Sequence, residues 1–251
     1  MKILVVGQSN NPGGVETVIK RYYETVKDDV QFDLMVFTDI CYDEEYYREH
    51  NSNIIFIKSA QFRQPFKYKK EIKTFFEQNS GIYSAIWFNC CDLANCGYIM
   101  KQAKKAGIKK RIIHAHNNQF MHTGKKRKFY ELVHNYWKNN IDRYATDYWA
   151  CSELAGEFFY KKSILESDNY RIINNAIEVK KYSRNTKIRD KVRTELGIGN
   201  NDIVVGHVGR FQYQKNHELL IDIYNSFHKK YSDSRLLLVG QGVEEEAIKD
   251  K

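Results

Sequence analysis

The sequence is poor in proline and contains no long apolar run. Only two of its 251 residues are proline and 42% are hydrophobic, which is typical of a globular chain and not of a linker. No stretch of about 18 apolar residues occurs, so we expect no membrane-spanning helix. The apolar part of residues 1–7 is too short for a secretory signal peptide and is better explained as a first strand. These absences predict a cytoplasmic protein.

Cysteine occurs without any CxxC pair. The five cysteines are an odd number, which predicts free thiols in a reducing compartment. Cys90, Cys91 and Cys96 form the densest group, but neighbouring residues of a strand point to opposite faces of a sheet, which disfavours a shared metal ion. We expect neither a metal nor a cofactor.

Negative charge is scarce in one region of the chain. Residues 101–150 contain twelve Lys or Arg against three Asp or Glu, so this region alone accounts for the net charge of +9. Such a region attracts anionic partners such as phospholipid, nucleic acid or sugar phosphates. An ordinary solvated basic face is the alternative explanation.

Short apolar segments alternate with amphipathic ones along most of the chain. Strands are expected at residues 2–7, 32–38, 53–58, 84–88, 110–116, 148–152 and 171–177, with helices between several of them. Because these strands are apolar throughout, they indicate a parallel sheet covered on both faces. Residues 178–201 are polar, and the pattern then starts again with strands at 203–208 and 235–239. The expected fold class is α/β, with two doubly wound units.

Residues 203–215 combine a strand, a glycine turn and two cations. Gly209 allows the backbone to come close to a ligand, and Arg210 and Lys215 follow it. Asn216 is predicted to cap the next helix. Together these features are typical of a phosphate site at a helix N-terminus, whereas a plain turn with two solvated cations explains them equally well.

A second glycine loop follows the first strand. Residues 8–14 are turn formers that end in Gly13 and Gly14, and a helix with Glu16 in its first turn comes next. The loop does not match GxGxxG, so the dinucleotide fingerprint is not met. The glycine pair can bring backbone amides to a ligand, although an ordinary strand-to-helix turn is the simpler explanation.

Polar side chains end the strand at residues 110–116. His114 and His116 project to the same face because side chains alternate along a strand, and Asn117 follows them. Ligands of open α/β sheets lie beyond the carboxyl ends of strands, so these three residues are candidates for binding a polar ligand. A structural polar cluster is the alternative. A zinc site would need further ligands, and His122 is the only nearby candidate.

A basic cluster, defined as Lys125, Lys126, Arg127 and Lys128, precedes an apolar stripe. The stripe recurs at helical spacing and consists of Phe129, Leu132, Val133, Tyr136 and Trp137. We assign the stripe to packing against the sheet, which is the commoner role of such a pattern. The basic cluster stays a candidate for contact with an anionic membrane, which would place the protein at the inner face of the membrane.

Six short segments carry a family resemblance. In chain order they are Gly13-Gly14-Val15-Glu16, His114-Ala115-His116-Asn117, Ala150-Cys151-Ser152, Ile173-Asn174-Asn175-Ala176-Ile177, Gly206-His207-Val208-Gly209-Arg210 with Lys215, and Leu237-Leu238-Val239-Gly240-Gln241-Gly242. In this order they resemble the GT-B glycosyltransferases of family 4, in particular bacterial members that build capsular or exopolysaccharide repeat units. Each segment is weak alone, but the six in order across nearly the whole chain are specific to the family, though not to a sugar.

The resemblance implies two Rossmann-like domains. Residues 1–176 would be the acceptor domain, and residues 177–251 the linker and first part of the nucleotide-sugar domain. It also implies a hexosyl-type transferase that moves a sugar from a nucleotide-diphospho-sugar with retention at the anomeric carbon. The acceptor would be a saccharide, lipid-linked in the membrane-associated members.

The resemblance also implies roles for single residues. By motif position, Arg210 and Lys215 would grip the diphosphate and offset the charge of the leaving group without a metal. His116 would contact the transferred sugar, with His114 as the second choice. The other substrate-binding residues implied are Gly13, Gly14, Glu16 and Asn117.

The chain departs from the family pattern near its C-terminus. The family has two glutamates eight positions apart that hold the donor, and Glu244, Glu245 and Glu246 do not match them. We therefore expect a truncated chain with an incomplete second domain, which binds substrate weakly or is inactive.

Three other functions stay open. One is a non-catalytic module that binds anions or nucleic acid, although the lysines of residues 101–128 lack the aromatic platform expected for single strands, so no nucleic acid is expected. A second is a sugar-nucleotide epimerase, which would form product without an acceptor. A third is a scaffold that needs a partner to complete its sheet.

Overall fold

The computed structural model describes residues 1–10, 12–121 and 124–251, apart from the side chains of Gly124 and Lys125. His122 and the Lys125 side chain, both named above, therefore lie outside the described residues. The chain divides into two compact units, Met1–Ile177 and Glu178–Lys251. The boundary expected from the sequence lies one residue earlier.

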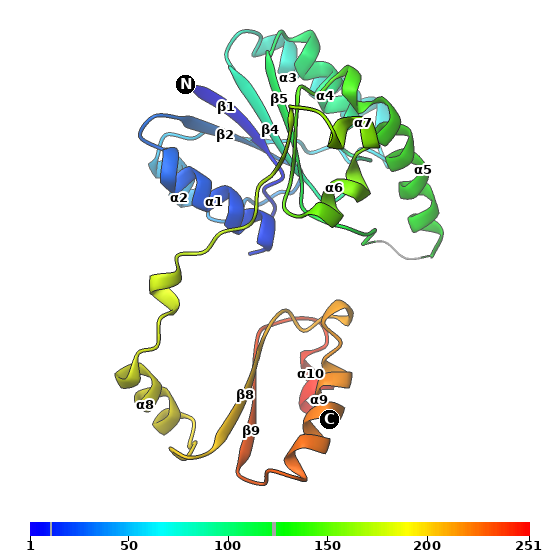
Figure 1. Ribbon diagram of the computed structural model, residues 1–251. Helices are drawn as coiled ribbons and strands as arrows, with labels where there is room; N and C mark the ends of the chain where they lie inside the picture. Colours follow the sequence, from blue (N-terminus) through cyan, green and yellow to red (C-terminus); the bar gives the residue numbers. More distant parts are fainter. Residues whose placement is uncertain (11, 122–123) are drawn as a thin grey trace. The chain divides into compact units, whose positions relative to one another are not determined.

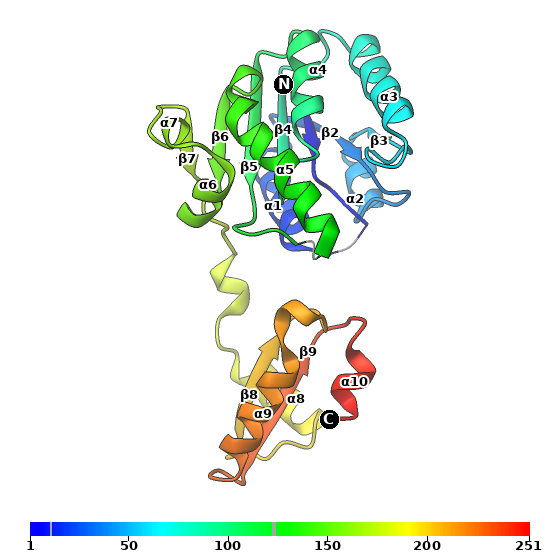
Figure 2. The same ribbon diagram turned by 90° about the vertical axis from the view of Figure 1, so that its right-hand side faces the viewer.

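Unit 1 is built on a seven-stranded sheet in which every pair of neighbours is parallel. The strands are β1 (Lys2–Val6), β2 (Gln31–Val36), β3 (Ile54–Phe56), β4 (Ala85–Cys90), β5 (Lys110–Ala115), β6 (Asp147–Ala150) and β7 (Tyr170–Ile172). Their order is β3-β2-β1-β4-β5-β6-β7. Figure 2 labels these strands apart from β1. The seven strands expected from the sequence are all present, with ends that differ by a few residues.

Helices cover both faces of this sheet (Figure 1). On one face lie α1 (Gly14–Val26) and α2 (Glu44–Glu49). On the other lie α3 (Pro65–Gln78), α4 (Gly97–Lys105), α5 (Gly124–Asn140), α6 (Glu153–Phe159) and α7 (Lys162–Leu165). Two separate apolar cores result, one on each face, which is why the strands are apolar along their whole length.

The strand order fixes where a ligand would bind. From β1 the chain builds the sheet outward through β2 to β3, and it then returns to place β4 on the other side of β1. In open α/β sheets this change of direction opens a crevice at the carboxyl ends of the strands. In unit 1 that position lies between the ends of β1 and β4, beside the end of β5.

Unit 2 contains a two-stranded parallel sheet with helices along it. Its elements are η2 (Val179–Tyr182), α8 (Thr186–Glu195), β8 (Ile203–Val208), η3 (Tyr213–Lys215), α9 (His217–His228), β9 (Ser234–Val239) and α10 (Glu245–Lys249). The sequence predicts a buried strand at residues 203–208, and this is wrong for burial, although the strand forms. Val208 is 78% exposed and Ile203 43%, because two strands are too few to enclose an apolar layer.

The α5 helix differs from its expected packing. Phe129, Leu132 and Tyr136 are exposed, by 49%, 71% and 59%, so assigning the whole stripe to the core is wrong. Only the neighbouring face packs inward: Trp137 is half-buried against Gly97 of α4. The helix is amphipathic over a narrower arc than the sequence suggests, and it leaves a second apolar stripe in solvent. Within the described part, no helix is both long enough and apolar enough to cross a bilayer.

Candidate functional site

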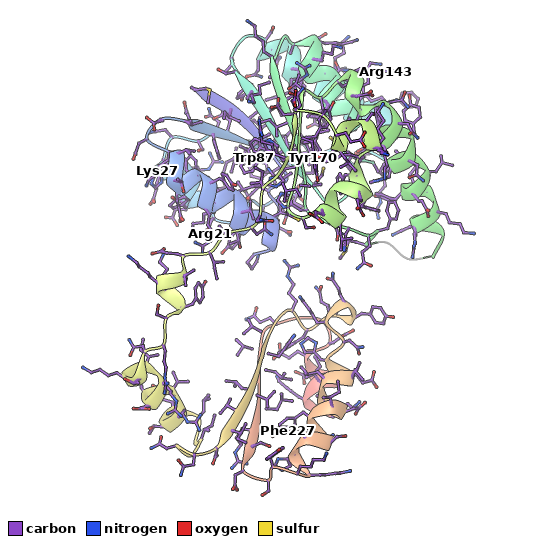
Figure 3. All side chains as sticks on the ribbon, in the orientation of Figure 1. Arg21, Lys27, Trp87, Arg143, Tyr170 and Phe227 are labelled. Carbon is purple, nitrogen blue, oxygen red and sulfur yellow. The ribbon has the colours of Figure 1, made fainter. Side chains whose placement is uncertain are left out.

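Two histidines lie together at the carboxyl end of β5. The ring centroids of His114 and His116 are 4.1 Å apart, as alternation along the strand predicts. His114 is fully buried, and its ring stacks on Trp87 and meets Trp149 edge-on. Figure 3 labels Trp87 in the interior of unit 1. His114 therefore lies beneath the carboxyl end of β5, in the interior, and the half-buried His116 lies nearer to solvent.

Both imidazoles are held neutral. Burial lowers the pKa of His114 to about 3, with a further contribution from His116, while the main chain at Ile173 favours the charged form. Burial lowers the pKa of His116 to about 4. Neither ring nitrogen of His114 makes a well-formed hydrogen bond within the described residues. At neutral pH the pair offers uncharged donors and acceptors and no cation.

Asn89 is a member of this group that the sequence analysis missed. Its Oδ1 lies 2.8 Å from Nε2 of His116, and the side chain is buried in β4. The sequence predicts that this strand ends at residue 88, which places Asn89 in the following loop, whereas β4 continues to Cys90. The register of β4 against β5 pairs Asn89 with His114, and this pairing cannot be derived from either segment alone.

The loop between β1 and α1 is held by side chains. Gln8 donates from Nε2 to the carbonyl of Tyr42 at 2.8 Å, and Tyr42 donates its amide to the Ser9 carbonyl. The Ser9 hydroxyl donates to the buried carboxylate of Glu16 at 2.5 Å. Glu16 thus fixes the entry to α1, which is a structural role in addition to the binding role implied above.

Gly14 begins α1 with open space around it. A Cβ built on Gly14 would meet no atom within 4 Å, so the fold itself does not require glycine there. Gly13 is the N-cap of α1, in extended conformation, and has no side chain to cap the helix. Asn117 uses its Oδ1 to accept from the Asn118 amide, which turns the side chain back onto its own loop. Gly14 is therefore better placed than Asn117 for contact with a ligand.

In unit 2 the two predicted cations lie on one turn. Arg210 and Lys215 are exposed, and the stem of Lys215 lies over Gly209, with Cε 3.4 Å from where a Cβ would stand. The left-handed Asn216 (φ 48°) caps α9, as predicted, by accepting from the Leu219 amide at 3.4 Å. The glycine turn, the two cations and the helix start are therefore consecutive parts of one local structure.

A second glycine loop packs against this turn. A Cβ on Gly240 would lie 1.9 Å from the Gly209 carbonyl oxygen, and one on Gly242 would lie 2.2 Å from that of Phe211. The Phe211 amide also donates to the carbonyl of Gln241 at 3.0 Å. The loops that follow β8 and β9 therefore pack backbone to backbone, which only glycine permits.

The predicted residues thus fall into two groups. Gly13, Gly14, Glu16 and Asn117 belong with His114 and His116 to the strand ends of unit 1, and Arg210 and Lys215 belong to unit 2. Among the residues that the structure describes, no group of three or more His, Cys, Asp or Glu is arranged to hold a metal ion.

Comparison with known proteins finds one family model and several relatives that resemble the chain. Residues 188–251 match the family model described as "Glycosyl transferases group 1". Over 98% of its length, the chain is 29% identical to the "Putative glycosyltransferase EpsF" of Bacillus subtilis (strain 168). The chain is thus similar to the group 1 glycosyl transferases in unit 2 and to EpsF along nearly its whole length. It spans 65% of the length of EpsF, and the family model matches part of unit 2.

Solved structures show the same fold. A glycosyltransferase from Rickettsia africae ESF-5 matches 99% of the chain with a TM-score of 0.69 at 12% identity, covering 62% of that protein. The lipopolysaccharide outer core galactosyltransferase WaaB, in its apo form, matches 100% with a TM-score of 0.62 at 16% identity, covering 64%. UDP-GlcNAc 2-epimerase from Neisseria meningitidis bound to UDP-GlcNAc matches 100% with a TM-score of 0.58 at 10% identity, covering 69%. The GT-B fold therefore includes both transferases and epimerases.

Proposed function

We propose that the protein is a retaining, hexosyl-type glycosyltransferase of surface polysaccharide synthesis. It moves a sugar from a nucleotide-diphospho-sugar to a saccharide acceptor, which is lipid-linked. The observation that carries this proposal is the turn from Gly209 to Asn216, which lies within the residues matched by the group 1 family model. The likeness to EpsF along 98% of the chain supports the same reaction class.

Unit 2 is proposed to bind the diphosphate. Arg210 offers a planar guanidinium for bidentate contact with phosphate oxygens, and Lys215 adds a mobile ammonium five residues later. The amides at the start of α9 add partial positive charge. As the bond between sugar and phosphate breaks, negative charge grows on the leaving diphosphate, and these groups offset it without a metal.

Unit 1 is proposed to contact the transferred sugar and its acceptor. His116 stands at the strand ends as a neutral hydrogen-bonding group, and the open space at Gly14 leaves room for a ligand against the start of α1. A neutral imidazole suits a sugar hydroxyl, since no proton has to be lost or gained on binding.

A thermal-shift panel tests the diphosphate site. The chain is heated with UDP-, GDP- and ADP-sugars, and we expect stabilisation by one nucleotide series and loss of that stabilisation in Arg210→Gln and Lys215→Gln. The matched control is Lys229→Gln/Lys230→Gln. These two residues follow the C-terminal end of α9, roughly 18 Å along the helix axis from its start. Variants at residues 210 and 215 that are stabilised as well as the parent would contradict the assignment.

The exposed stripe of α5 supports a membrane-bound acceptor. We use the name apolar face for four exposed side chains, which are Phe129, Leu132 and Tyr136 of the stripe and Phe62. Phe62, 37% exposed, packs edge-on against Phe129 with ring centroids 5.1 Å apart, so the face is continuous between two segments. The part of the basic cluster that the structure describes, Lys126 to Lys128, is exposed one turn before it.

Basic and apolar groups side by side are the composition of an interfacial helix. Aromatic and aliphatic side chains enter the headgroup region while lysine and arginine meet anionic lipid, and each basic residue contributes about 1 kcal/mol. The lipid of a lipid-linked saccharide lies in the membrane, so an enzyme that uses this acceptor has to reach the membrane surface. We propose that α5 and Phe62 form the membrane contact of unit 1.

Vesicle co-sedimentation tests the membrane contact. The protein should bind vesicles that contain phosphatidylglycerol and not pure phosphatidylcholine, with less binding at high salt. Removing two charges in Lys126→Gln/Lys128→Gln should weaken binding roughly thirtyfold. The control Lys187→Gln/Lys191→Gln removes the same charge from α8. Equal loss in both pairs would show attraction by net charge alone and would overturn the proposal.

A further inference from the structure

Asn89 lies at the switch point of unit 1 and connects the strands on either side. Its Nδ2 donates to the Val6 carbonyl of β1 at 3.3 Å, and its Oδ1 lies 2.8 Å from Nε2 of His116. Gly7 makes this approach possible: its φ is +120°, and a Cβ there would lie 2.3 Å from the Asn89 carbonyl oxygen. Asn89 is 2% exposed, so its amide is fixed between a backbone carbonyl and an imidazole.

The orientation of this amide determines which imidazole nitrogen carries the hydrogen. The Val6 carbonyl can only accept, so Asn89 must present its NH₂ group to it. The amide oxygen then faces His116, and because this oxygen also only accepts, Nε2 must be the donor. A neutral imidazole with hydrogen on Nε2 has its free lone pair on Nδ1.

Neutrality of His116 is supported by its surroundings. Burial lowers its pKa to about 4, and the titratable ring in contact with it is His114, at 4.1 Å, which is itself neutral at physiological pH. No described residue donates a hydrogen bond to Nδ1 of His116. The lone pair is therefore available to a ligand at the carboxyl end of β5.

We propose that Asn89 is a positioning residue that holds His116 as a hydrogen-bond acceptor at Nδ1. The inference rests on the proposed function for the nature of the ligand, a sugar. An acceptor at Nδ1 selects a group with a hydrogen to give, such as a hydroxyl or the N–H of an N-acetyl group. The carboxylate of a uronic acid has no such hydrogen, so the site disfavours a sugar that would place a carboxylate against Nδ1.

Nitrogen NMR of the histidine rings tests the tautomer directly in the wild-type chain. With ¹⁵N-labelled histidine at pH 7.5, we expect the His116 signals, assigned with His116→Gln, to show a protonated Nε2 and an unprotonated Nδ1. His134 is an internal reference, because Leu93 donates to its Nδ1 at 3.1 Å and its Nε2 lies 3.0 Å from the Phe158 carbonyl. A protonated Nδ1 or a charged ring at His116 would overturn the inference.

Two variants separate positioning from packing. In Asn89→Leu the His116 signals should become those of mixed tautomers, while the His134 signals stay in place and report an intact fold. In Asn89→Asp the carboxylate can still accept from Nε2, so the tautomer should be kept and the pKa of His116 should rise. An unchanged His116 tautomer in a folded Asn89→Leu protein would show that Asn89 does not set it.

Ligand addition distinguishes this inference from the proposed function. UDP-glucose and UDP-glucuronate, or the GDP series if thermal shift favours it, are added to the labelled chain. We expect the uncharged sugar to move the His116 Nδ1 signal and the uronate to move it at least fivefold less at equal occupancy. If both nucleotides bind and move it equally, the selectivity is wrong. If the tautomer is as assigned but no nucleotide-sugar binds, the proposed function fails and the role of Asn89 stands.

Discussion

The two units use the same parallel strands with different results for burial. In unit 1, Ile86 of β4 and Val6 of β1 are fully buried, because helices cover both faces of a seven-stranded sheet. In unit 2, Ile203 and Val208 of β8 are 43% and 78% exposed in a sheet of two strands. Local sequence does not explain the difference, because four of the six residues of β8 are Ile or Val, against one of six in β4 and three of five in β1.

This difference shows that strand formation and strand burial have different causes. Local composition decides that residues 203–208 form a strand, as it does for residues 85–90. The number of strands and covering helices decides whether that strand is buried. Unit 2 should therefore be the less stable unit, and its polar turn at Arg210 should depend less on a packed core than the strand-end cluster of unit 1 does. The following predictions test that contrast, beginning with the largest expected effect.

Replacing Gly7 by alanine should damage unit 1 most. The positive φ and the 2.3 Å approach to Asn89 add backbone strain to a clash with main chain, so we expect a loss of about 4 kcal/mol in the stability of unit 1. All three tryptophans, at residues 87, 137 and 149, belong to unit 1, so tryptophan fluorescence in urea reports this unit alone. Gly14→Ala, which meets no atom within 4 Å, is the control and should unfold like the parent.

Matched isoleucine truncations should separate the two sheets. Ile86→Ala removes a fully buried side chain from β4 and should cost about 2–5 kcal/mol, whereas Ile203→Ala in β8 should cost less than about 1 kcal/mol. Urea unfolding followed by tryptophan for unit 1, and by amide exchange of β8 for unit 2, gives both values. Equal losses would mean that β8 is as well packed as β4, contrary to the exposed fractions.

Low pH should lower the stability of unit 1, because its two neutral histidines, His114 and His116, bind protons more readily in the unfolded chain. The folded-state pKa values of His114 and His116, about 3 and about 4, lie below the unfolded value near 6.5, so the unfolded chain binds more protons between these limits. The stabilisation is complete above pH 6.5 and is lost as the pH falls toward 4. For His116 it amounts to roughly 3 kcal/mol.

A urea titration at pH 7.5 and at pH 4.5 measures this loss. The double variant His114→Gln/His116→Gln removes both groups and should show a smaller difference between the two pH values than the parent. If the parent and the variant lose the same stability, the acid sensitivity arises from carboxylates elsewhere in the chain.

The helix caps should give the smallest effect. The Ser152 hydroxyl accepts from the Ala155 amide at 3.2 Å and caps α6, so Ser152→Ala should cost about 1 kcal/mol in unit 1. Ser152→Asp keeps an acceptor at the cap and should recover most of the loss. If Ser152→Ala and Ser152→Asp have the same free energy of unfolding in urea, the cap does not contribute to stability.

Much of the architecture follows from the sequence, since apolar strands bounded by glycine and polar turns identify seven parallel strands in unit 1. The strand-end histidines follow as well, because alternation alone puts residues 114 and 116 on one face. Asn89 does not follow, because its contact with His116 depends on the register between β4 and β5, which no local pattern encodes.

The α5 stripe illustrates a second limit. Helical periodicity identifies apolar positions but not which of two adjacent stripes meets the sheet. In the structure the Trp137 ring packs against Gly97, and Leu132 and Tyr136 lie in solvent. The short helix α2 was also missed, because its residues Glu44–Glu49 are mostly polar and show no clear periodicity.

The central claim is that the turn at residues 209–216 binds a nucleotide diphosphate. It is tested most directly by titrating the ¹⁵N-labelled chain with UDP and with GDP while following every assigned amide. The account predicts saturable shifts centred on Gly209, Arg210 and Asn216, lost in Arg210→Gln/Lys215→Gln. Shifts confined to the exposed lysines at the start of α5, with no preference between the two nucleotides, would contradict it and favour an unspecific anion-binding surface.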